Sequence, residues 1–468
     1  MPPTTDDPTL EHRLVAEFLD GACDADASAG PGAPLDDTLA ALAALGLQPG
    51  SAVLLALSNS VHMLRLYLSA LLLGLVPLAV APATASVRVR GLAGRLGVRA
   101  LIASRPDPQR YGALGVHPVP GGAAVLLEPA GAQASPYRAG DVLMSTSGTS
   151  GAFSACLHRV SSLLRNARRH ARAVGLRAGD TVLVSLPLYY SYAMVAQVLA
   201  AYVSGARVVV AGPPFSPAGY LQQIADHEVT HSSVTPAVVR RLLEGGVGAP
   251  AARVLTVGGD RLPPEHVARL LADRPGGELY VTYGLTEAGP RVSTLAAHAE
   301  PAHRYASVGL PLPGVRVWLR EPVGDDGTGE LMVATDTALV RKISDAGPGG
   351  RTLAAPGVVA TGDVFRLDDD GYLYHRGRLS DFVVIRGEKV SLGSVRRAAH
   401  ALPGVVGCVT TVGVGEDGDA FVDVEVAVTD PEPEAAQRIR RALKSFLLPG
   451  ERPRTVTVIA ADPQAFHK

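Results

Sequence analysis

The sequence has few cysteines and no excess of either charge. Its 468 residues include 3 cysteines, Cys23, Cys156 and Cys408, which lie far apart with no CxxC spacing. This usage fits a reducing cytosol and excludes a disulfide framework or a paired-cysteine metal site. Lys+Arg total 43 and Asp+Glu total 44, so there is no electrostatic reason to expect binding to nucleic acid. We therefore expect a soluble, cytoplasmic protein without a nucleic-acid partner.

An uninterrupted hydrophobic run of membrane-spanning length is also missing. The segment Leu64–Ala83 is apolar and long enough to be mistaken for a span, but Pro77 and Pro82 break it and Gly74 can end a helix. It predicts a buried helix followed by a core strand. The N-terminal stretch "MPPTTDDPTLEH" is acidic and lacks an apolar region, so no secretory signal and no membrane association are expected.

Strand-like and helix-like patterns alternate over the first two thirds of the chain. At about 150 residues per domain, the length suggests roughly three domain-sized units. Between about residue 35 and residue 300, longer helical patterns separate six apolar runs. Such alternation predicts parallel sheets covered by helices. The six runs are "SAVLLAL", "RALIAS", "DTVLVSL", "ARVVVAG", "ARVLTVGG" and "ELYVTYG".

The pattern changes in the last third. After about residue 300, short strands separated by Gly, Asp and Pro turns predict a small β-rich subdomain, and "GVRVWLREPVGDDGTGELMVATD" is the clearest example. From residue 380 a compact α+β pattern follows that can fold as a separate lid. We therefore predict a core domain over residues 1–379 and a mobile C-terminal domain over residues 380–468.

One polar loop carries the strongest local signal. Eight residues from Ser145 contain two glycines and five hydroxyl side chains, between a predicted strand "GDVLM" and a predicted helix "HRVSSLLRNARRHARAV". Backbone N–H groups and hydroxyls in such a loop suit the oxygens of a polyphosphate. The loop lacks GxxxxGK[ST], and no GxGxxG follows a strand, so neither familiar nucleotide motif applies. A flexible linker would have the same composition.

Further motifs distinguish between these two interpretations. "TYGLTEAG" spans Thr282–Gly289, "VGLPLPGVRV" spans Val308–Val317, and "TGDVFRLDDDGYLYHRGRLSDFVVIRGEKVSLGSV" spans Thr361–Val395. With the loop, and in this order, they resemble the adenylate-forming superfamily of acyl-CoA synthetases, luciferases and peptide-synthetase adenylation domains. The resemblance extends from about Leu47 to the last strand. It implies an α/β fold: a large domain of two parallel αβα sheets plus a small β-barrel-like subdomain, and a small α+β lid.

The resemblance also implies a reaction and the residues that bind ATP. Such enzymes join a carboxylate to the α-phosphate of ATP, release pyrophosphate, and pass the acyl group to a second nucleophile. A carboxylate needs no general base, so the first step depends on positioning and on neutralising phosphate charge. Glu287 would bind Mg²⁺ through hard oxygen ligands, with Thr286 beside it. The phosphate loop would be Thr146, Ser147, Gly148, Thr149, Ser150 and Gly151; the adenine pocket Gly258, Gly259, Asp260, Tyr283 and Gly284; and the ribose and α-phosphate residues Asp363 and Arg378.

The sequence departs from the family pattern at three places. The loop's usual Pro and Lys positions hold Phe153 and Ser154, so the customary phosphate-facing lysine is absent. Either Arg159 or another cation replaces it, or pyrophosphate leaves more slowly. The hinge position holds Ser380, whose hydroxyl can serve because a hinge needs tolerant backbone angles. The catalytic lysine of the family is matched best by Lys468, which four residues separate from Pro463 where the family has five. A solvated, frayed segment is the alternative for Lys468.

The substrate side is marked by "LPLYYSYAMVAQ". By resemblance, Tyr189, Tyr190, Ser191 and Tyr192 form one wall of the acyl pocket, and they are closer to the pattern of aryl-CoA ligases than to that of fatty-acid enzymes. Aromatic walls favour flat rings by about 0.5–1.5 kcal/mol per contact. A benzoate-like or cinnamate-like acid is therefore expected, although ordinary core tyrosines would give the same letters. The stretch offers no carboxylate for an amino group, which argues against a free α-amino acid.

The letters "HEVTH", His227–His231, match the HExxH zinc pattern. That pattern binds zinc only when both histidines share one face of a helix. Here a helix should end before the motif, and "VTHSSV" is β-branched and strand-like. We therefore predict that the side chains diverge and that no zinc is bound.

The leading hypothesis is an ATP- and Mg²⁺-dependent ligase that adenylates an aromatic carboxylic acid and transfers the acyl group to CoA. Two alternatives remain. The same fold can use another acceptor, such as the thiol of a separate carrier protein or an amine, or another oxyanion such as nitrite. The absent loop lysine, altered hinge and displaced terminal lysine would also suit a non-catalytic protein that binds a nucleotide or an acyl ligand.

Overall fold

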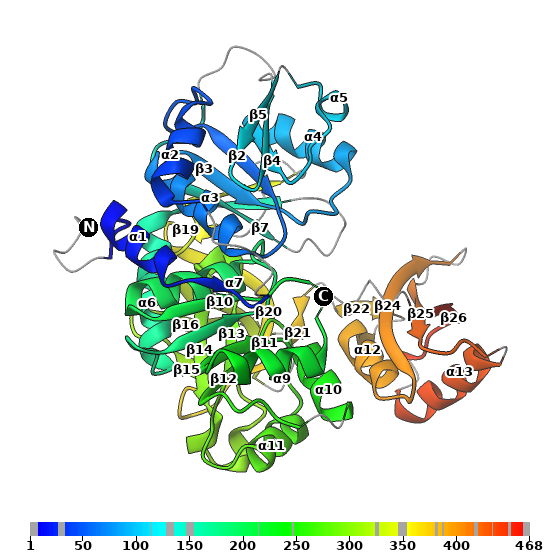
Figure 1. Cartoon of the computed structure of the whole chain (residues 1–468). Helices are drawn as coiled ribbons and strands as arrows, with labels where there is room; N and C mark the ends of the chain where they lie inside the picture. The colour runs from blue at the N-terminus through cyan, green and yellow to red at the C-terminus, as the bar shows by residue number, and fades with distance from the viewer. Residues whose placement is uncertain are drawn as a thin grey trace. The chain divides into compact units, whose positions relative to one another are not determined.

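The computed structural model (Figure 1) divides into two compact units. The first contains Met1–Trp318, Met332–Thr361 and Leu367–Tyr374, and the second contains Leu319–Leu331, Gly362–Arg366 and His375–Lys468. The residues that the structure describes are 8–26, 33–113, 115–127, 135–146, 154–213, 215–245, 248–322, 327–344, 353–379, 382–385, 388–415, 420–432, 434–447 and 451–461.

The larger sheet of the first unit has eight strands, in the order β1-β10-β9-β11-β12-β13-β14-β15. The six strands β1, β10, β9, β11, β12 and β13 are parallel, and β14 is antiparallel to both of its neighbours, β13 and β15. The apolar runs expected to form parallel strands do so. The bounds are β1 Cys23–Asp24, β9 Thr181–Val184, β10 Arg207–Val210, β11 His231–Val234, β12 Val254–Gly258, β13 Glu278–Gly284, β14 Arg291–Ala296 and β15 Leu310–Pro311.

Helices cover both faces of this sheet. Along β9, Leu183 packs into one apolar cluster while Val182 and Val184 pack into another, as the two-residue repeat of a strand requires. Both clusters are buried, which explains why central strands such as β9 and β10 have apolar residues on both faces rather than in alternation. The helices of the first cluster are α9 Pro217–Asp226, α10 Pro236–Glu244 and α11 Pro264–Asp273; those of the second include α6 Val160–Ala173, α7 Ser191–Ala193, the π-helical turn η1 Met194–Leu199 and α8 Ala200–Ser204.

The smaller sheet has five strands, in the order β3-β2-β4-β6-β5. Strands β3, β2 and β4 are parallel to one another, as predicted. Strand β6 is antiparallel to both of its neighbours, β4 and β5, so one edge of the sheet is antiparallel. The bounds are β2 Ala52–Ala56, β3 Val76–Ala79, β4 Val98–Ala103, β5 Gly115–Val119 and β6 Gly122–Leu126, with helices α1 His12–Asp20, α2 Leu35–Ala43, α3 Val61–Leu72, α4 Ser86–Leu96 and α5 Pro108–Tyr111.

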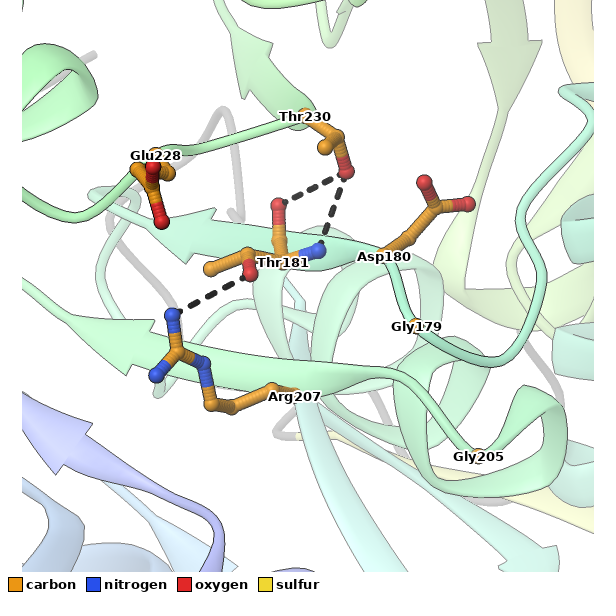
Figure 2. A pocket seen from close by; sticks show the side chains of 7 residues that line it. All are labelled: Gly179, Asp180, Thr181, Gly205, Arg207, Glu228 and Thr230. Carbon is orange, nitrogen blue, oxygen red and sulfur yellow. Dashed lines mark hydrogen bonds between the residues drawn. The ribbon is translucent and has the colours of Figure 1, made fainter.

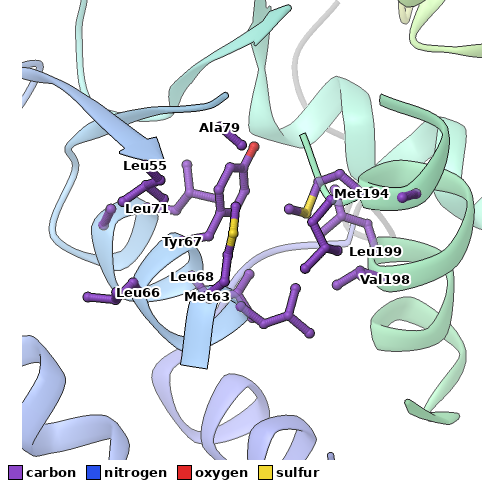
Figure 3. Packing of buried hydrophobic residues seen from close by; sticks show 14 of the residues in the cluster. Leu55, Met63, Leu66, Tyr67, Leu68, Leu71, Ala79, Met194, Val198 and Leu199 are labelled. Atoms are coloured by element: carbon purple, nitrogen blue, oxygen red, sulfur yellow. The ribbon is translucent and has the colours of Figure 1, made fainter. Parts of the chain in front are cut away.

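The long apolar segment lies inside the first unit. It forms α3 and then β3, as predicted, and its side chains Met63 and Tyr67 lie in the same buried cluster as Met194 and Leu199 of η1. Figure 3 shows these residues, far apart in the sequence, packed together. None of the helices in the described ranges is long and apolar enough to span a membrane.

A small antiparallel sheet follows the polar loop. Its order is β18-β8-β7, with β7 Asp141–Thr146, β8 Ser154–Arg159 and β18 Arg341–Ser344. The prediction that a helix begins at His158 is therefore wrong, because Ser154–Arg159 pairs on both edges as a strand and the helix begins at Val160. Pairing with β7 and β18 provides hydrogen bonds on both edges of this strand, and this tertiary pairing overrides the local helical pattern.

The short strands predicted after residue 300 form a further sheet, in the order β16-β17-β20-β19, with β21 beside β20. Three short 3₁₀ turns precede it in the chain, one between β13 and β14 and two between β14 and β15 of the large sheet. The bounds are β16 Arg316–Pro322, β17 Gly329–Ala334, β19 Leu353–Ala355, β20 Val358–Leu367, β21 Leu373–Arg378, η2 Thr286–Ala288, η3 Ala297–Ala299 and η4 Ala302–Arg304.

The C-terminal part of the second unit has its own apolar core. Strands β24 and β25 are antiparallel, β26 is parallel to β25, and the two helices bury Val395, Ile439 and Leu443 in this core. The α+β pattern expected here is confirmed, and the boundary at residues 379 and 380 stays a prediction. The bounds are β22 Phe382–Ile385, β23 Glu388–Ser391, α12 Leu392–His400, β24 Val405–Val414, β25 Ala420–Val428, α13 Ala435–Phe446 and β26 Thr455–Ala460.

Candidate functional site

The predicted site residues fall into three sets. Seven of them lie outside the described residues: Ser147, Gly148, Thr149, Ser150, Gly151, Ser380 and Lys468. Twelve lie in the first unit, and Asp363 and Arg378 lie in the second. The twelve are Thr146, Tyr189, Tyr190, Ser191, Tyr192, Gly258, Gly259, Asp260, Tyr283, Gly284, Thr286 and Glu287.

The polar loop connects the two strands of a hairpin. Thr146 is the last residue of β7 and Ser154 the first of β8, and their hydroxyl groups are hydrogen-bonded. Strand β8 then carries the chain away by about 3.4 Å per residue, or about 17 Å to Arg159. The amino terminus of α6 is therefore far from the base of the loop, so the predicted phosphate site would not include the N–H groups of that helix end.

Glu287 lies beside this hairpin in the short turn η2. Its carboxylate Oε1 accepts a hydrogen bond and ion pair from Lys342 Nζ at 2.8 Å, and the Glu287 side chain is 13% exposed. Its backbone carbonyl accepts from Leu339 N at 2.9 Å, which fixes the turn against the residues leading into β18. Sequence reasoning missed Lys342, because no motif surrounds it and only strand pairing brings it to Glu287.

The donor set of this site fits Mg²⁺ that arrives with a nucleotide. Glu287 offers hard carboxylate oxygens near the protein surface, next to the loop expected to hold phosphates. Mg²⁺ commonly uses one or two carboxylates and takes its other ligands from phosphates and water. No cluster of three or more His, Cys, Asp or Glu suited to a metal occurs within the described ranges. Glu287 as the metal carboxylate stays a proposal, and ATP would supply the remaining anionic ligands.

The two basic residues at the end of β8, His158 and Arg159, do not supply a positive charge to the loop. Arg159 pairs with the buried Asp141 at the far end of the hairpin, so it does not replace the missing loop lysine in this arrangement. His158 is fully buried, and burial lowers its pKa to about 4, so the imidazole is neutral at pH 7. Neither side chain can place a positive charge at the loop.

The predicted adenine residues lie at the carboxyl ends of two parallel strands. Gly258 ends β12 and is paired with Thr282 of β13, just before Tyr283 and Gly284. In open α/β sheets this edge is where ligands bind. A Cβ added to Gly284 would lie 1.9 Å from the carbonyl oxygen of Pro290, and Gly259 has a φ of +92°, so the turns here require glycine.

The tyrosine run divides into one buried and two half-buried members. Tyr192 is 7% exposed, its hydroxyl is hydrogen-bonded to Thr256 Oγ1 at 3.2 Å, and the Arg291 guanidinium lies 4.2 Å from its ring centre. It packs as a core tyrosine. Tyr189 and Tyr190 are only half-buried, and their ring centres lie 4.6 Å apart.

Two hydrogen bonds connect this run to the predicted nucleotide residues. Ser145 Oγ donates to the carbonyl of Tyr189 at 3.0 Å, and Ser191 Oγ is bonded to Thr286 Oγ1 at 2.8 Å. The aromatic segment is therefore fixed at one end to the strand before the polar loop and at the other to the residue before Glu287.

In the second unit, Asp363 and Arg378 lie on neighbouring strands. Arg378 Nε donates to Asp363 Oδ1 at 2.9 Å, with the Asp363 side chain 5% exposed and the Arg378 side chain 46% exposed. Strand β20 holds the carboxylate and β21 holds the guanidinium, whose exposure leaves it able to change partners. The structure brings these two predicted residues together, and their roles toward ribose and α-phosphate stay predictions.

A pocket of about 500 Å³ lies elsewhere, and Figure 2 shows its lining. Thr181 and Arg207 begin β9 and β10, so it lies at the amino ends of the parallel strands, opposite the edge that carries Gly258 and Tyr283. It is therefore separate from the candidate site. The nearby HExxH letters do not form a helical pair, since α9 ends before His227 and His231 begins β11.

Comparison with known proteins identifies the family. The model of the family "AMP-binding enzyme" matches residues 38–340. A 3-hydroxybenzoate–CoA ligase of Aromatoleum sp. (strain CIB) is 26% identical over 461 residues, covering 91% of this chain and 86% of that protein. A salicylyl-CoA synthase / salicylate adenylyltransferase of Streptomyces sp. is 28% identical over 446 residues, covering 86% of this chain and 79% of that protein.

The fold is also shared with a solved ligase structure. o-Succinylbenzoate CoA synthetase from Bacillus subtilis, in complex with its acyl-adenylate intermediate, superposes with a TM-score of 0.77 at 20% identity, covering 92% of this chain and 89% of that one. This likeness confirms the predicted large N-terminal and small C-terminal arrangement of elements. Because the family model spans well over half of the sequence, this chain belongs to the AMP-binding enzymes, the adenylate-forming superfamily of ligases.

Proposed function

We propose that this enzyme adenylates an aromatic carboxylic acid with ATP and Mg²⁺ and transfers the acyl group to CoA. The observation that carries this proposal is the half-buried pair Tyr189 and Tyr190, fixed by Ser145 and Ser191 to the predicted nucleotide residues. Two relatives at 26% and 28% identity are named for hydroxybenzoate and salicylate, which supports the same substrate class.

In the proposed first step, a carboxylate oxygen of the acid attacks the α-phosphorus of ATP, and the bond to the β-phosphate oxygen breaks. Pyrophosphate leaves with its electron pair, and no protein base is needed because the acid is already ionised. Mg²⁺ would neutralise charge on the phosphate oxygens. The protein's part is to position both reactants: Thr146 and the loop toward the phosphates, Glu287 toward the metal, and Asp363 toward the ribose.

In the second step, the thiolate of CoA attacks the acyl carbon of the adenylate and AMP leaves. Lys468 is the proposed cation between the α-phosphate and the carboxylate in the first step, and Ser380 the proposed hinge for the change between steps. A carrier protein is not required by this scheme, since CoA itself supplies the thiol.

Isotope exchange between pyrophosphate and ATP tests the first step. We expect exchange with Mg²⁺ and a benzoate or cinnamate, and at least about 10-fold weaker exchange with fatty acids or amino acids, because flat rings gain about 0.5–1.5 kcal/mol from each aromatic contact. Adding CoA should yield the aryl-CoA thioester and AMP. Exchange that is strongest with a fatty acid would contradict the aromatic assignment, and exchange without thioester formation would contradict CoA as the acceptor.

Changing Tyr190 to leucine should alter acid preference without altering nucleotide binding. We expect kcat/KM for the preferred aromatic acid to fall about 3- to 10-fold, since one ring contact is lost. The KM for ATP should remain the same. Tyr111→Leu, in the short helix α5, is the matched control and should leave both constants unchanged. Equal kcat/KM in Tyr190→Leu and the unmodified enzyme would remove Tyr190 from the acyl pocket.

A further inference from the structure

Lys342 shares one face of the small sheet with the hydroxyls at the base of the polar loop. Lys342 is directly opposite Cys156 on β8, and Ser154, two residues earlier on β8, is opposite Thr146 on β7. Opposed residues project on the same face of a sheet, and so do residues two apart. Lys342, Ser154 and Thr146 therefore project together.

Glu287 lies over this same face. Its carboxylate reaches Lys342 Nζ at 2.8 Å. Burial raises the pKa of the Cys156 thiol on this face, and the negative charge of Glu287 raises it further. The face thus combines one carboxylate, one ammonium and two hydroxyl groups beside the loop. Ser154 occupies the position where the family's loop normally carries a phosphate-facing lysine, so this face lacks the usual cation and has Lys342 two strand positions away.

We propose that Lys342 is the residue that binds the β- and γ-phosphate oxygens of ATP, in place of the missing loop lysine. The proposal rests on the adenylation reaction proposed above. In the nucleotide-free chain, Glu287 holds the Lys342 ammonium; with MgATP bound, Glu287 serves the metal and Lys342 Nζ donates to phosphate oxygens. This change of partners leaves both the Glu287 carboxylate and the Lys342 ammonium paired with an opposite charge in the free and in the bound state.

The properties of the ion pair suit such an exchange. The Lys342 side chain is 28% exposed and the Glu287 side chain 13% exposed, so the ammonium is accessible to a ligand that enters from solvent. Partly exposed ion pairs contribute little to stability, and a lysine is a mobile point charge with three donors. By contrast, Arg159 is paired with the buried Asp141, and His158 is neutral, so neither offers an equivalent charge.

The test compares nucleotides that differ only in the phosphates that Lys342 would bind. Calorimetric titration of the full chain with ATP and with AMP, both with Mg²⁺, measures each affinity without any acid. We expect Lys342→Met to weaken ATP binding about 10- to 100-fold, as for the loss of a charge-assisted hydrogen bond, and to leave AMP binding unchanged. Lys342→Arg should restore ATP binding to within about 3-fold.

Arg341→Met is the matched control. Arg341 precedes Lys342 on the same strand, and its guanidinium instead lies 5.7 Å from the ring centre of Tyr137. This variant removes a neighbouring positive charge, and we expect unchanged affinity for both nucleotides. Equal loss of ATP affinity in Arg341→Met and Lys342→Met would reduce the effect to general electrostatics and overturn the proposal.

Three other results would also overturn the inference. If Lys342→Met binds ATP with unchanged affinity, Lys342 does not contact the phosphates. If the variant binds ATP more tightly, Lys342 instead competes with the metal for Glu287. If Lys342→Met loses affinity for ATP and AMP to the same extent, Lys342 does not act through the β- and γ-phosphates, which AMP lacks. If ATP binding depends on Lys342 but no aromatic acid supports exchange, the inference stands and the proposed substrate fails, so the two failures are distinguishable.

Discussion

Replacing Glu287 with glutamine is expected to reduce acid-dependent pyrophosphate exchange by about 100- to 1,000-fold, the size typical of losing one electrostatic group from a transition state. Glutamine keeps the shape of the side chain and removes its charge. In the described structure Lys342 Nζ pairs with this carboxylate at 2.8 Å, and the backbone N–H of Leu339 donates to the backbone carbonyl of Glu287. A neutral amide would neither attract Mg²⁺ nor hold the lysine.

The measurement is the exchange rate as a function of Mg²⁺ concentration. The half-saturating Mg²⁺ concentration should rise at least about 10-fold, consistent with the loss of a carboxylate ligand from a site that has one or two. Glu265→Gln, an exposed glutamate in the first turn of α11, is the control and should behave as the unmodified enzyme. A Glu287→Gln enzyme with the same rate and the same Mg²⁺ dependence would show that the metal is held elsewhere.

Strands β9, β10, β12 and β13 of the large sheet could be predicted from the sequence because they are largely apolar on both faces. Runs such as Val182–Val184 and Val208–Val210 have no polar alternation, which occurs when helices cover both sides. Their regular separation by helical patterns then favours parallel pairing. Gly284 belongs to the motif "TYGLTEAG", and the structure gives a physical reason for glycine there, because the carbonyl of Pro290 leaves no room for a Cβ.

The small sheet around the loop could not be predicted in the same way. The sequence pattern predicts that His158 and Arg159 begin a helix, and they instead end strand β8 because β7 and β18 pair with its two edges. Strand β18 comes from more than 180 residues later in the sequence, and no local pattern reports such a pairing. Lys342 was missed for the same reason, since its proximity to Glu287 depends on that register.

Tyr192 illustrates a different limit. The run of tyrosines suggested one aromatic wall, but side-chain direction within the run depends on the turn into α7 and η1. Tyr192 points into the core and bonds to Thr256, whereas Tyr189 and Tyr190 remain half-buried. Sequence letters identify the segment, and the fold decides which of its rings can meet a substrate.

Replacing Asp363 with alanine is expected to weaken the binding of both ATP and AMP by about 100- to 1,000-fold. As the proposed partner of both ribose hydroxyls, Asp363 would accept two hydrogen bonds, each worth about 1.5–3 kcal/mol when one group is charged. The Asp363 side chain is 5% exposed and receives Arg378 Nε at 2.9 Å. Because Arg378 is 46% exposed, water can solvate it in the variant, and the fold should tolerate the change.

Ribose analogues separate this role from general damage to the fold. The unmodified enzyme should bind 3′-deoxy-ATP about 10-fold more weakly than ATP, as expected for one lost hydrogen bond to a charged group. Asp363→Ala should bind ATP and 3′-deoxy-ATP with equal affinity, because the variant lacks the carboxylate that would accept a hydrogen bond from the 3′-hydroxyl. Asp369→Ala, an exposed carboxylate between β20 and β21, should retain the discrimination. If Asp363→Ala still prefers ATP over 3′-deoxy-ATP by the original factor, the ribose hydroxyl is recognised by another residue, and the β20–β21 pair serves only to hold the strands together.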